Sequence, residues 1–119
     1  VLLHSLCDAL LGSLALGDIG FHFPDTDSKF AKINSAKLLE STMALITENH
    51  YVVCNVDLTL IAEKPKIAAY VGSMRRVISD ILDVSFDKVS IKATTTEGMG
   101  FVGRGEGLGA IAVVLVDQR

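Results

Sequence analysis

The sequence predicts an α+β fold of two layers, in which helices cover one face of a mixed β-sheet. Apolar residues recur at helical spacing in three segments and alternate with polar residues in three others, in the order helix, helix, strand, helix, strand, strand. Half of the 119 residues are apolar, which is enough for the core of a single domain over residues 1–119. The uncovered sheet face is also expected to be apolar, so we expect the chain to form oligomers through it.

Three helices are expected from the spacing of apolar side chains. The first starts at the beginning of the chain and ends at Gly17, because glycine favours helix termination. The second runs from a cap at Asn34 or Ser35 to about Glu48, and the third covers about 66–82. The polar residues of the first helix lie on one narrow strip: His4, Ser5, Asp8 and Gly12. This strip can face a site.

Three strands complete the pattern. Residues 52–62 alternate apolar and polar side chains in part, as a strand with one covered face does, and 88–93 and 108–116 are the other two. His22 and His50 lie in turns, where we expect solvated side chains.

Charge and hydropathy exclude several classes of protein. The net charge of −3 and the scattered basic residues argue against a nucleic-acid-binding protein. The longest apolar run, 110–116, is too short to span a bilayer, so we expect a soluble protein that binds no membrane. Cys7 and Cys54 lack metal or redox spacing and are interpreted as buried thiols in a reducing compartment, with a disulfide between them as the alternative.

The segment Thr94-Thr95-Thr96-Glu97 is the strongest sign of function. Its three hydroxyls and one carboxylate stand between a predicted strand and a glycine-rich stretch that contains Arg104. A metal-bound phosphate needs such donors, an anionic metal ligand and close backbone approach. No Gly-Lys-Ser/Thr follows, so the segment is not a nucleotide-binding P-loop. A strand end followed by a glycine hairpin is the alternative.

Two more places carry groups suited to a site. His4 and Asp8 lie one helical turn apart, and a carboxylate commonly orients a metal-binding histidine; a hydrogen-bonded core histidine is the alternative. Loop 17–27 is either a functional loop or an ordinary turn, and its carboxylates are Asp18, Asp25 and Asp27.

Taken together, the motifs resemble the 2-C-methyl-D-erythritol 2,4-cyclodiphosphate synthases of non-mevalonate isoprenoid synthesis. They occur in order over almost the whole chain: His-x3-Asp-x2-Leu-Gly from His4, Leu-Gly-Asp-Ile-Gly from Leu16, Phe-Pro-Asp-Thr-Asp from Phe23, Pro65-Lys66, Lys-Ala-Thr-Thr-Thr-Glu from Lys92, and Gly-Phe-Val-Gly-Arg-Gly-Glu-Gly from Gly100. The resemblance implies a homotrimer with active sites between subunits. It also implies that the 2-phosphate of 4-diphosphocytidyl-2-C-methyl-D-erythritol 2-phosphate attacks the β-phosphate and releases CMP.

The same resemblance implies two metal ions. Zinc is held in the family by an Asp-x-His pair on the first strand and by a histidine that matches His4, with Asp8 behind it. Magnesium or manganese is held by the glutamate that matches Glu97. Zinc with three protein ligands keeps a position open for a phosphate oxygen.

The resemblance also implies which residues contact the substrate, by their positions in the motifs. Thr94, Thr95 and Thr96 match the segment that grips the diphosphate, with Thr95 positioning the transition state. The sugar-contact loop matches Asp18, Ile19 and Gly20, and the flexible loop after it matches Phe23, Pro24, Asp25, Thr26 and Asp27. The backbone of the cytosine pocket matches Ala62, Lys64, Pro65, Lys66, Ile67 and Ala68, where side chains such as that of Glu63 are free to vary. Phe101 and Arg104 match residues near the phosphates and the trimer axis.

Two departures from the family pattern affect these expectations. The Asp-x-His pair and a substrate-binding His-Ser pair lie upstream of Val1 in the family, so we expect the chain as written to lack an N-terminal strand region and two of three zinc ligands. A glutamate that lines an axial cavity for isoprenoid diphosphates is replaced by Ile111, which argues against regulation by such ligands.

The sequence is consistent with two functions. The first is the cyclising lyase, in the cytoplasm of a bacterium or in a plastid stroma. The second is a trimeric protein that binds cytidine nucleotides or isoprenoid phosphates without turnover, a hypothesis motivated by the absent upstream ligands.

Overall fold

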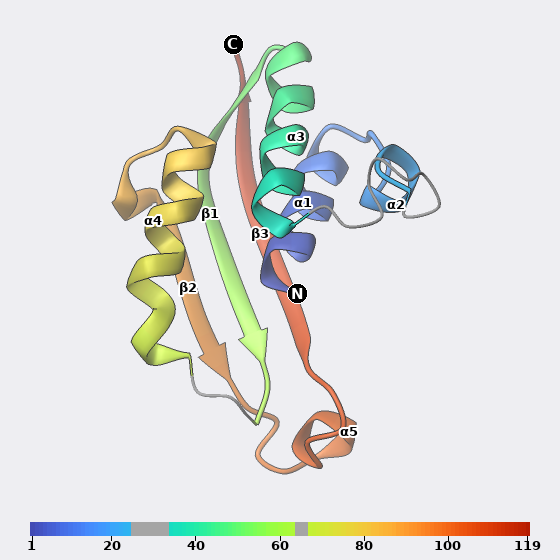
Figure 1. Cartoon of the computed structure of the whole chain (residues 1–119), viewed down its shortest axis with the longest axis vertical. Helices are drawn as coiled ribbons and strands as arrows, with labels where there is room; N and C mark the ends of the chain where they lie inside the picture. The colour runs from blue at the N-terminus through green and yellow to red at the C-terminus, as the bar shows by residue number, and fades with distance from the viewer. Residues whose placement is uncertain (25–33, 64–66) are drawn as a thin grey trace.

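One mixed sheet forms a layer of the protein and helices form the other (Figure 1). The computed structural model describes residues 1–24, 34–63 and 67–119. Its three strands lie in the order β2-β1-β3: the central β1 (Tyr51–Ile61) is parallel to β2 (Val89–Thr94) and antiparallel to β3 (Gly109–Gln118). The predicted two-layer α+β class is confirmed.

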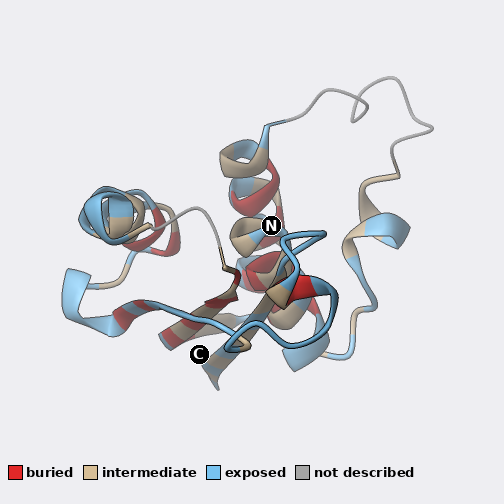
Figure 2. Cartoon of the chain, turned by 90° about the horizontal axis from the view of Figure 1, so that it is seen from below, coloured by how far each residue is buried: buried red, intermediate tan, exposed pale blue. Residues whose placement is uncertain are grey.

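The three long helices all pack on one face of the sheet. α1 (Leu2–Ser13) contacts β3 and α3 (Ser35–Glu48), and α4 (Val71–Leu82) contacts β2. Buried side chains gather where these helices face the strands (Figure 2). They come from α1, α3, α4, β1 and β2, and the largest that are fully buried include Leu6, Leu10, Leu11, Leu39, Ile46, Val56, Leu58 and Val89.

Two helix boundaries differ from the prediction. α1 ends at Ser13, before Gly17, because Ala15 takes the left-handed conformation (φ 57°) and the N–H groups of Ala15 and Leu16 donate to the O atoms of Gly12 and Leu11. The third helix begins as the 3₁₀ turn η1 (Ala68–Tyr70), and Pro65 and Lys66 lie outside the described residues.

Three short helical turns were not predicted. They are α2 (Ile19–His22), η2 (Phe86–Lys88) and α5 (Gly100–Gly103). Elements of three or four residues are too short to show a hydrophobic period, so nothing in the sequence pattern marks them. Two of them, α2 and α5, lie beside the candidate site.

The expected apolar outer face of the sheet is confined to one strand. On β3, the outward side chains Ile111, Val113 and Leu115 are 53%, 62% and 60% exposed. The neighbouring strands instead present an ion pair, because Lys92 Nζ lies 2.8 Å from Asp57 Oδ2, and this hydrogen bond lowers the pKa of the aspartate. The expected apolar outer face is therefore limited to a narrow strip on β3, which lies beside a charged strip.

Both cysteines are free thiols, so the disulfide alternative does not occur. Cys7 is fully buried and Cys54 is partly buried. Burial raises the pKa of the Cys7 thiol to about 11. Among the described residues, no helix has both the length and the apolar character needed to cross a membrane.

Candidate functional site

Parallel pairing of β1 and β2 brings two predicted parts of the site together. Parallel strands end at the same edge of a sheet, so the residues after Ile61 lie beside those at Thr94. The N–H of Ala62 continues the ladder by donating to the O atom of Thr94 at 3.0 Å. The nucleoside side of the predicted site and its phosphate side therefore meet at one sheet edge.

A tight turn follows the threonines. The N–H of Met99 donates to the O atom of Thr96 at 3.1 Å, and the two residues between them, Glu97 and Gly98, have φ values of 55° and 83°. Positive φ at both central positions is the signature of a type I′ turn. Left-handed backbone costs a non-glycine residue about 1–2 kcal/mol, and such strain is concentrated at functional sites. Glu97 shares this conformation with Ala15, His50 and Asp83, and it is the one of these four that lies in the predicted phosphate segment.

The threonine hydroxyls have different roles. Thr95 Oγ1 accepts a hydrogen bond from the N–H of Glu97 at 3.1 Å, so the proton of this exposed hydroxyl is left for a ligand. Thr96 Oγ1 donates its proton to the O atom of Met99 at 2.6 Å and so stabilises the turn. This difference supports Thr95 as the hydroxyl that contacts phosphate.

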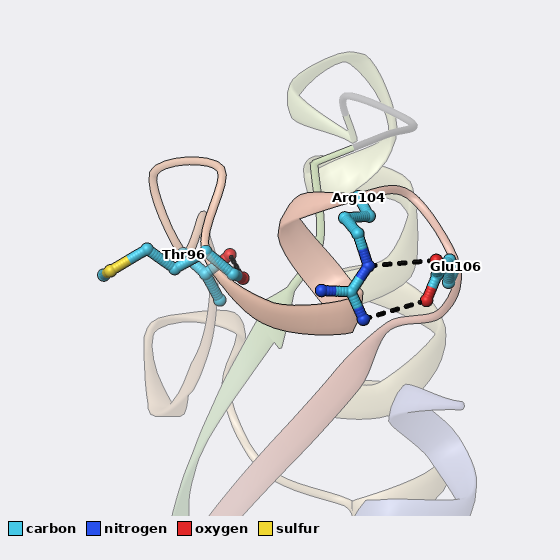
Figure 3. Close-up of polar contacts among 4 residues, drawn as sticks. Thr96, Arg104 and Glu106 are labelled. Atoms are coloured by element: carbon cyan, nitrogen blue, oxygen red, sulfur yellow. Dashed lines mark hydrogen bonds and ion pairs between the residues drawn. The ribbon is translucent and has the colours of Figure 1, made fainter.

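The helical turn α5 packs directly against this β-turn. A Cβ atom on Gly103 would lie 2.1 Å from the backbone carbon of Gly98, which only glycine avoids. On the other side of α5 from Thr96, Arg104 pairs with Glu106 through bonds of 2.9 and 3.1 Å (Figure 3). Phe101 is 55% exposed, and its ring would lie 3.1 Å from a Cβ atom on Gly107.

Two hollows open on this edge. One of about 230 Å³ is lined by Ala62, Glu63, Ile67, Ala68, Ala93, Thr94 and Thr95. The structure thus brings together the described part of the predicted cytosine pocket and two of the threonines, whereas Lys64, Pro65 and Lys66 lie outside the described residues. The other hollow, of about 450 Å³, is lined by Glu63 and by the 103–108 stretch that includes Arg104.

The sugar-contact loop is built onto α1. Asp8 Oδ1 accepts from the N–H of Ile19 at 2.9 Å, which ties the first helix to α2. Asp18 Oδ1 caps α2 by accepting from the N–H of Phe21 at 2.9 Å, a structural role of the kind expected for a turn-forming aspartate. A Cβ atom on Gly20 would lie 3.5 Å from that same Oδ1 atom.

Two other residues shape this loop. His22 Nε2 lies 2.6 Å from the O atom of Leu16, so the expectation that His22 is solvated was wrong. Phe23 is half-buried and packs on the core, and Pro24 is also half-buried. Asp25, Thr26 and Asp27 lie outside the described residues.

The described residues offer few ligands for a metal ion. His4 is exposed on α1, and the described part of the chain holds no group of three His, Cys, Asp or Glu side chains that suits a metal. A zinc ion needs three or four such ligands, so these residues do not complete a zinc site. Magnesium is commonly held by one or two carboxylates with water and substrate phosphates, and the exposed Glu97 supplies one carboxylate.

The two halves of the predicted site lie apart in one subunit. In Figure 1, α2 lies beside α1 and α3, whereas the stretch between β2 and α5 that contains Glu97 lies toward the other end of the long axis. Within residues 1–24, 34–63 and 67–119, the two hollows at the sheet edge are lined by residues of the Thr94 half and by none of the Asp18 half.

Comparison with known proteins shows to which family this sequence and fold belong. The family model of the YgbB family matches residues 1–117. The chain belongs to the YgbB family. Curated YgbB relatives are named 2-C-methyl-D-erythritol 2,4-cyclodiphosphate synthase, which confirms the family expected from the motifs. That of Geobacter metallireducens is 52% identical over 119 residues, which are 100% of this chain and 76% of the relative. That of Alkaliphilus metalliredigens is 54% identical over 118 residues, 99% of this chain and 74% of the relative.

Solved structures share the fold. The bifunctional IspDF from Campylobacter jejuni matches with a TM-score of 0.94 and 39% identity over 100% of this chain, which corresponds to 32% of that longer protein. IspF from Plasmodium falciparum, solved as a CDP complex, matches with a TM-score of 0.85 and 32% identity over 98% of this chain and 70% of that one.

The close approach of Gly103 to Gly98 leads to a testable prediction about the stability of this YgbB protein. Gly103→Ala must displace the Thr96–Met99 turn, and we expect it to cost about 1–3 kcal/mol of unfolding free energy. Gly72→Ala is the matched control, because a Cβ there meets nothing within 4 Å and alanine favours the helix by about 0.5–1 kcal/mol. Urea unfolding of both variants measures the difference, and equal stability would contradict the close packing of α5.

Proposed function

We propose that this protein converts 4-diphosphocytidyl-2-C-methyl-D-erythritol 2-phosphate into 2-C-methyl-D-erythritol 2,4-cyclodiphosphate and CMP. The observation that carries the proposal is the hollow at the β1–β2 edge, where the backbone after β1 meets Thr94 and Thr95. The names of the curated relatives support the same reaction.

In the proposed complex, the cytidine lies in the hollow between Ala62 and Ala68. Main-chain groups there read the edge of the base, a role that does not depend on the side chains of Ile67 or Ala68. The diphosphate extends toward Thr94, Thr95 and Glu97. The CDP complex of the Plasmodium falciparum relative supports a cytidine diphosphate ligand of this kind.

The chemical step is an intramolecular phosphoryl transfer. An oxygen of the 2-phosphate forms a bond to the β-phosphorus, and the bond from that phosphorus to the bridging oxygen breaks, so that CMP leaves with the electron pair. Such reactions depend mainly on alignment and on stabilising negative charge. Thr95 donates a hydrogen bond from its hydroxyl group to a β-phosphate oxygen. This bond holds the β-phosphate in line with the attacking 2-phosphate.

Magnesium or manganese, when bound at Glu97, supplies positive charge to the α- and β-phosphates. The positive-φ turn and the bond from the Glu97 N–H to Thr95 Oγ1 set the backbone from which the Glu97 side chain extends. His4 is our proposal for one zinc ligand, by its place in the family motif. Because the described residues do not complete a zinc site, no step of the reaction is assigned to zinc.

The separation of the two halves of the site supports a proposal about assembly. In a homotrimer, the loop of Asp18, Ile19 and Gly20 from one subunit faces the Thr94–Glu97 segment of its neighbour, so each active site is shared. The exposed apolar strip of β3, formed by Ile111, Val113 and Leu115, is the surface available to pack around a trimer axis. We place the enzyme in the cytoplasm of a bacterium or in a plastid stroma, by analogy with the family.

The reaction itself is tested by product analysis. Full-length protein with zinc and magnesium is incubated with the cytidyl substrate, and CMP is followed by chromatography while the cyclic diphosphate is followed by ³¹P NMR. Equal amounts of both products are expected. Binding of the substrate without release of CMP would support the non-catalytic alternative instead.

Thr95 gives a prediction specific to the chemical step. Thr95→Val keeps the volume of the side chain and removes the hydroxyl, so we expect kcat to fall by about a hundredfold or more, as for the loss of one transition-state donor. Thr95→Ser keeps the hydroxyl and should retain most of the activity. Steady-state kinetics of both variants measure the effect, and full activity of Thr95→Val would exclude this role.

Glu97 gives a prediction about the metal. Glu97→Gln removes the charge of an exposed turn side chain, so we expect a higher magnesium concentration for half-maximal activity and weaker CDP binding. The trimer should stay intact because no core volume is lost. Magnesium titration and sedimentation of the variant check both parts, and dissociation into monomers would show that Glu97 has a structural role.

A further inference from the structure

Glu63 makes contacts that its sequence context did not indicate. Its side chain was expected to vary freely beside the cytosine pocket. Instead, Glu63 Oε1 accepts a hydrogen bond from the N–H of Gly98 at 3.2 Å and lies 3.4 Å from Thr96 Oγ1. A half-buried carboxylate is therefore directed at the turn that carries Glu97.

The bond from Gly98 is the more important of these two contacts. The single hydroxyl proton of Thr96 has a closer acceptor, the O atom of Met99 at 2.6 Å. Among the described residues, the carboxylate of Glu63 is the acceptor that the N–H of Gly98 reaches. Glu63 therefore acts mainly on the Gly98 backbone.

Two consecutive residues thus hold both ends of the phosphate segment. The N–H of Ala62 donates to the O atom of Thr94, and the carboxylate of Glu63 accepts from Gly98. Thr95 and Glu97 lie between these two fixed points. Glu63 also lines both hollows, so it stands at the boundary between the proposed nucleoside pocket and the glycine-rich stretch.

We propose that Glu63 is a positioning residue, which holds the Gly98 amide and thereby fixes the turn that presents Thr95 and Glu97 to the diphosphate. This inference rests on the proposed function for its catalytic consequence and on the hydrogen bonds alone for its effect on the turn. The role requires an acceptor oxygen at the end of the side chain. It does not require a negative charge.

Two variants separate these requirements in the full-length protein. Glu63→Ala removes the acceptor, whereas Glu63→Gln keeps an amide oxygen in the same place without charge. Glu40→Ala is the control, because it removes an exposed glutamate from α3. Thermal unfolding and sedimentation establish that each variant is folded and assembled, and Glu63→Ser, whose side chain is too short to reach Gly98, replaces Glu63→Ala if alanine disturbs folding.

Hydrogen–deuterium exchange of the peptide that contains residues 94–100 is the first readout. We expect exchange at the turn to be about tenfold faster in Glu63→Ala, and close to that of the unmodified protein in Glu63→Gln and Glu40→Ala. Unchanged exchange in Glu63→Ala would overturn the proposal. This comparison needs no substrate, so it decides the role of Glu63 even if the protein releases no CMP and the proposed function fails.

Kinetics supply the second readout. We expect Glu63→Ala to lower kcat by about ten- to a hundredfold with a smaller change in KM, and Glu63→Gln to restore most of kcat. Affinity for CDP with magnesium, measured by calorimetry, should fall in Glu63→Ala and recover in Glu63→Gln. If Glu63→Gln is as defective as Glu63→Ala, the residue acts through its charge and the positioning role is wrong.

Discussion

Parallel pairing of β1 with β2 is the constraint on which the site depends. It places the ends of both strands at one edge, and the bond between Ala62 and Thr94 continues the ladder into the loops. Everything proposed for substrate binding starts there: the hollow beside Ile67, the free hydroxyl of Thr95 and the strained backbone of Glu97. The helix α4, which connects the two strands, packs on the covered face and leaves this edge open.

The same layered fold also separates the other half of the site. Asp8 and Asp18 are fixed to α1 and α2 in the helical layer, away from the turn at Glu97. The two groups of predicted site residues therefore lie apart in the chain, and the strip on β3 is an exposed apolar surface. The proposal of sites shared between subunits rests on this arrangement, because one half belongs to the helical layer and the other to the sheet edge.

Sequence patterns predicted the elements that bury many residues. The strand at 52–62 and the helix ending at Glu48 were recovered because their apolar periods are long. The short α2 and α5 have no period, and the left-handed Ala15 ended α1 without the expected glycine. The Glu63–Gly98 bond spans 35 residues and has no local signal, so only the fold reveals it. Motif order identified the family, whereas the division of roles between Thr95 and Thr96 required their hydrogen bonds.

We propose that each active site combines the Asp18 loop of one subunit with the Thr95 segment of its neighbour, and mixing of subunits tests this arrangement. Asp18→Ala removes the side chain that caps α2 and shapes the sugar-contact loop, and Thr95→Val removes the donor, so each homotrimer should be nearly inactive. When the two variants are unfolded together at equal amounts and refolded as mixed trimers, shared sites predict recovery of about a quarter of full activity, because one site in four receives both intact halves. No recovery in trimers shown by mass spectrometry to be mixed would contradict the account and place both halves of each site within one subunit.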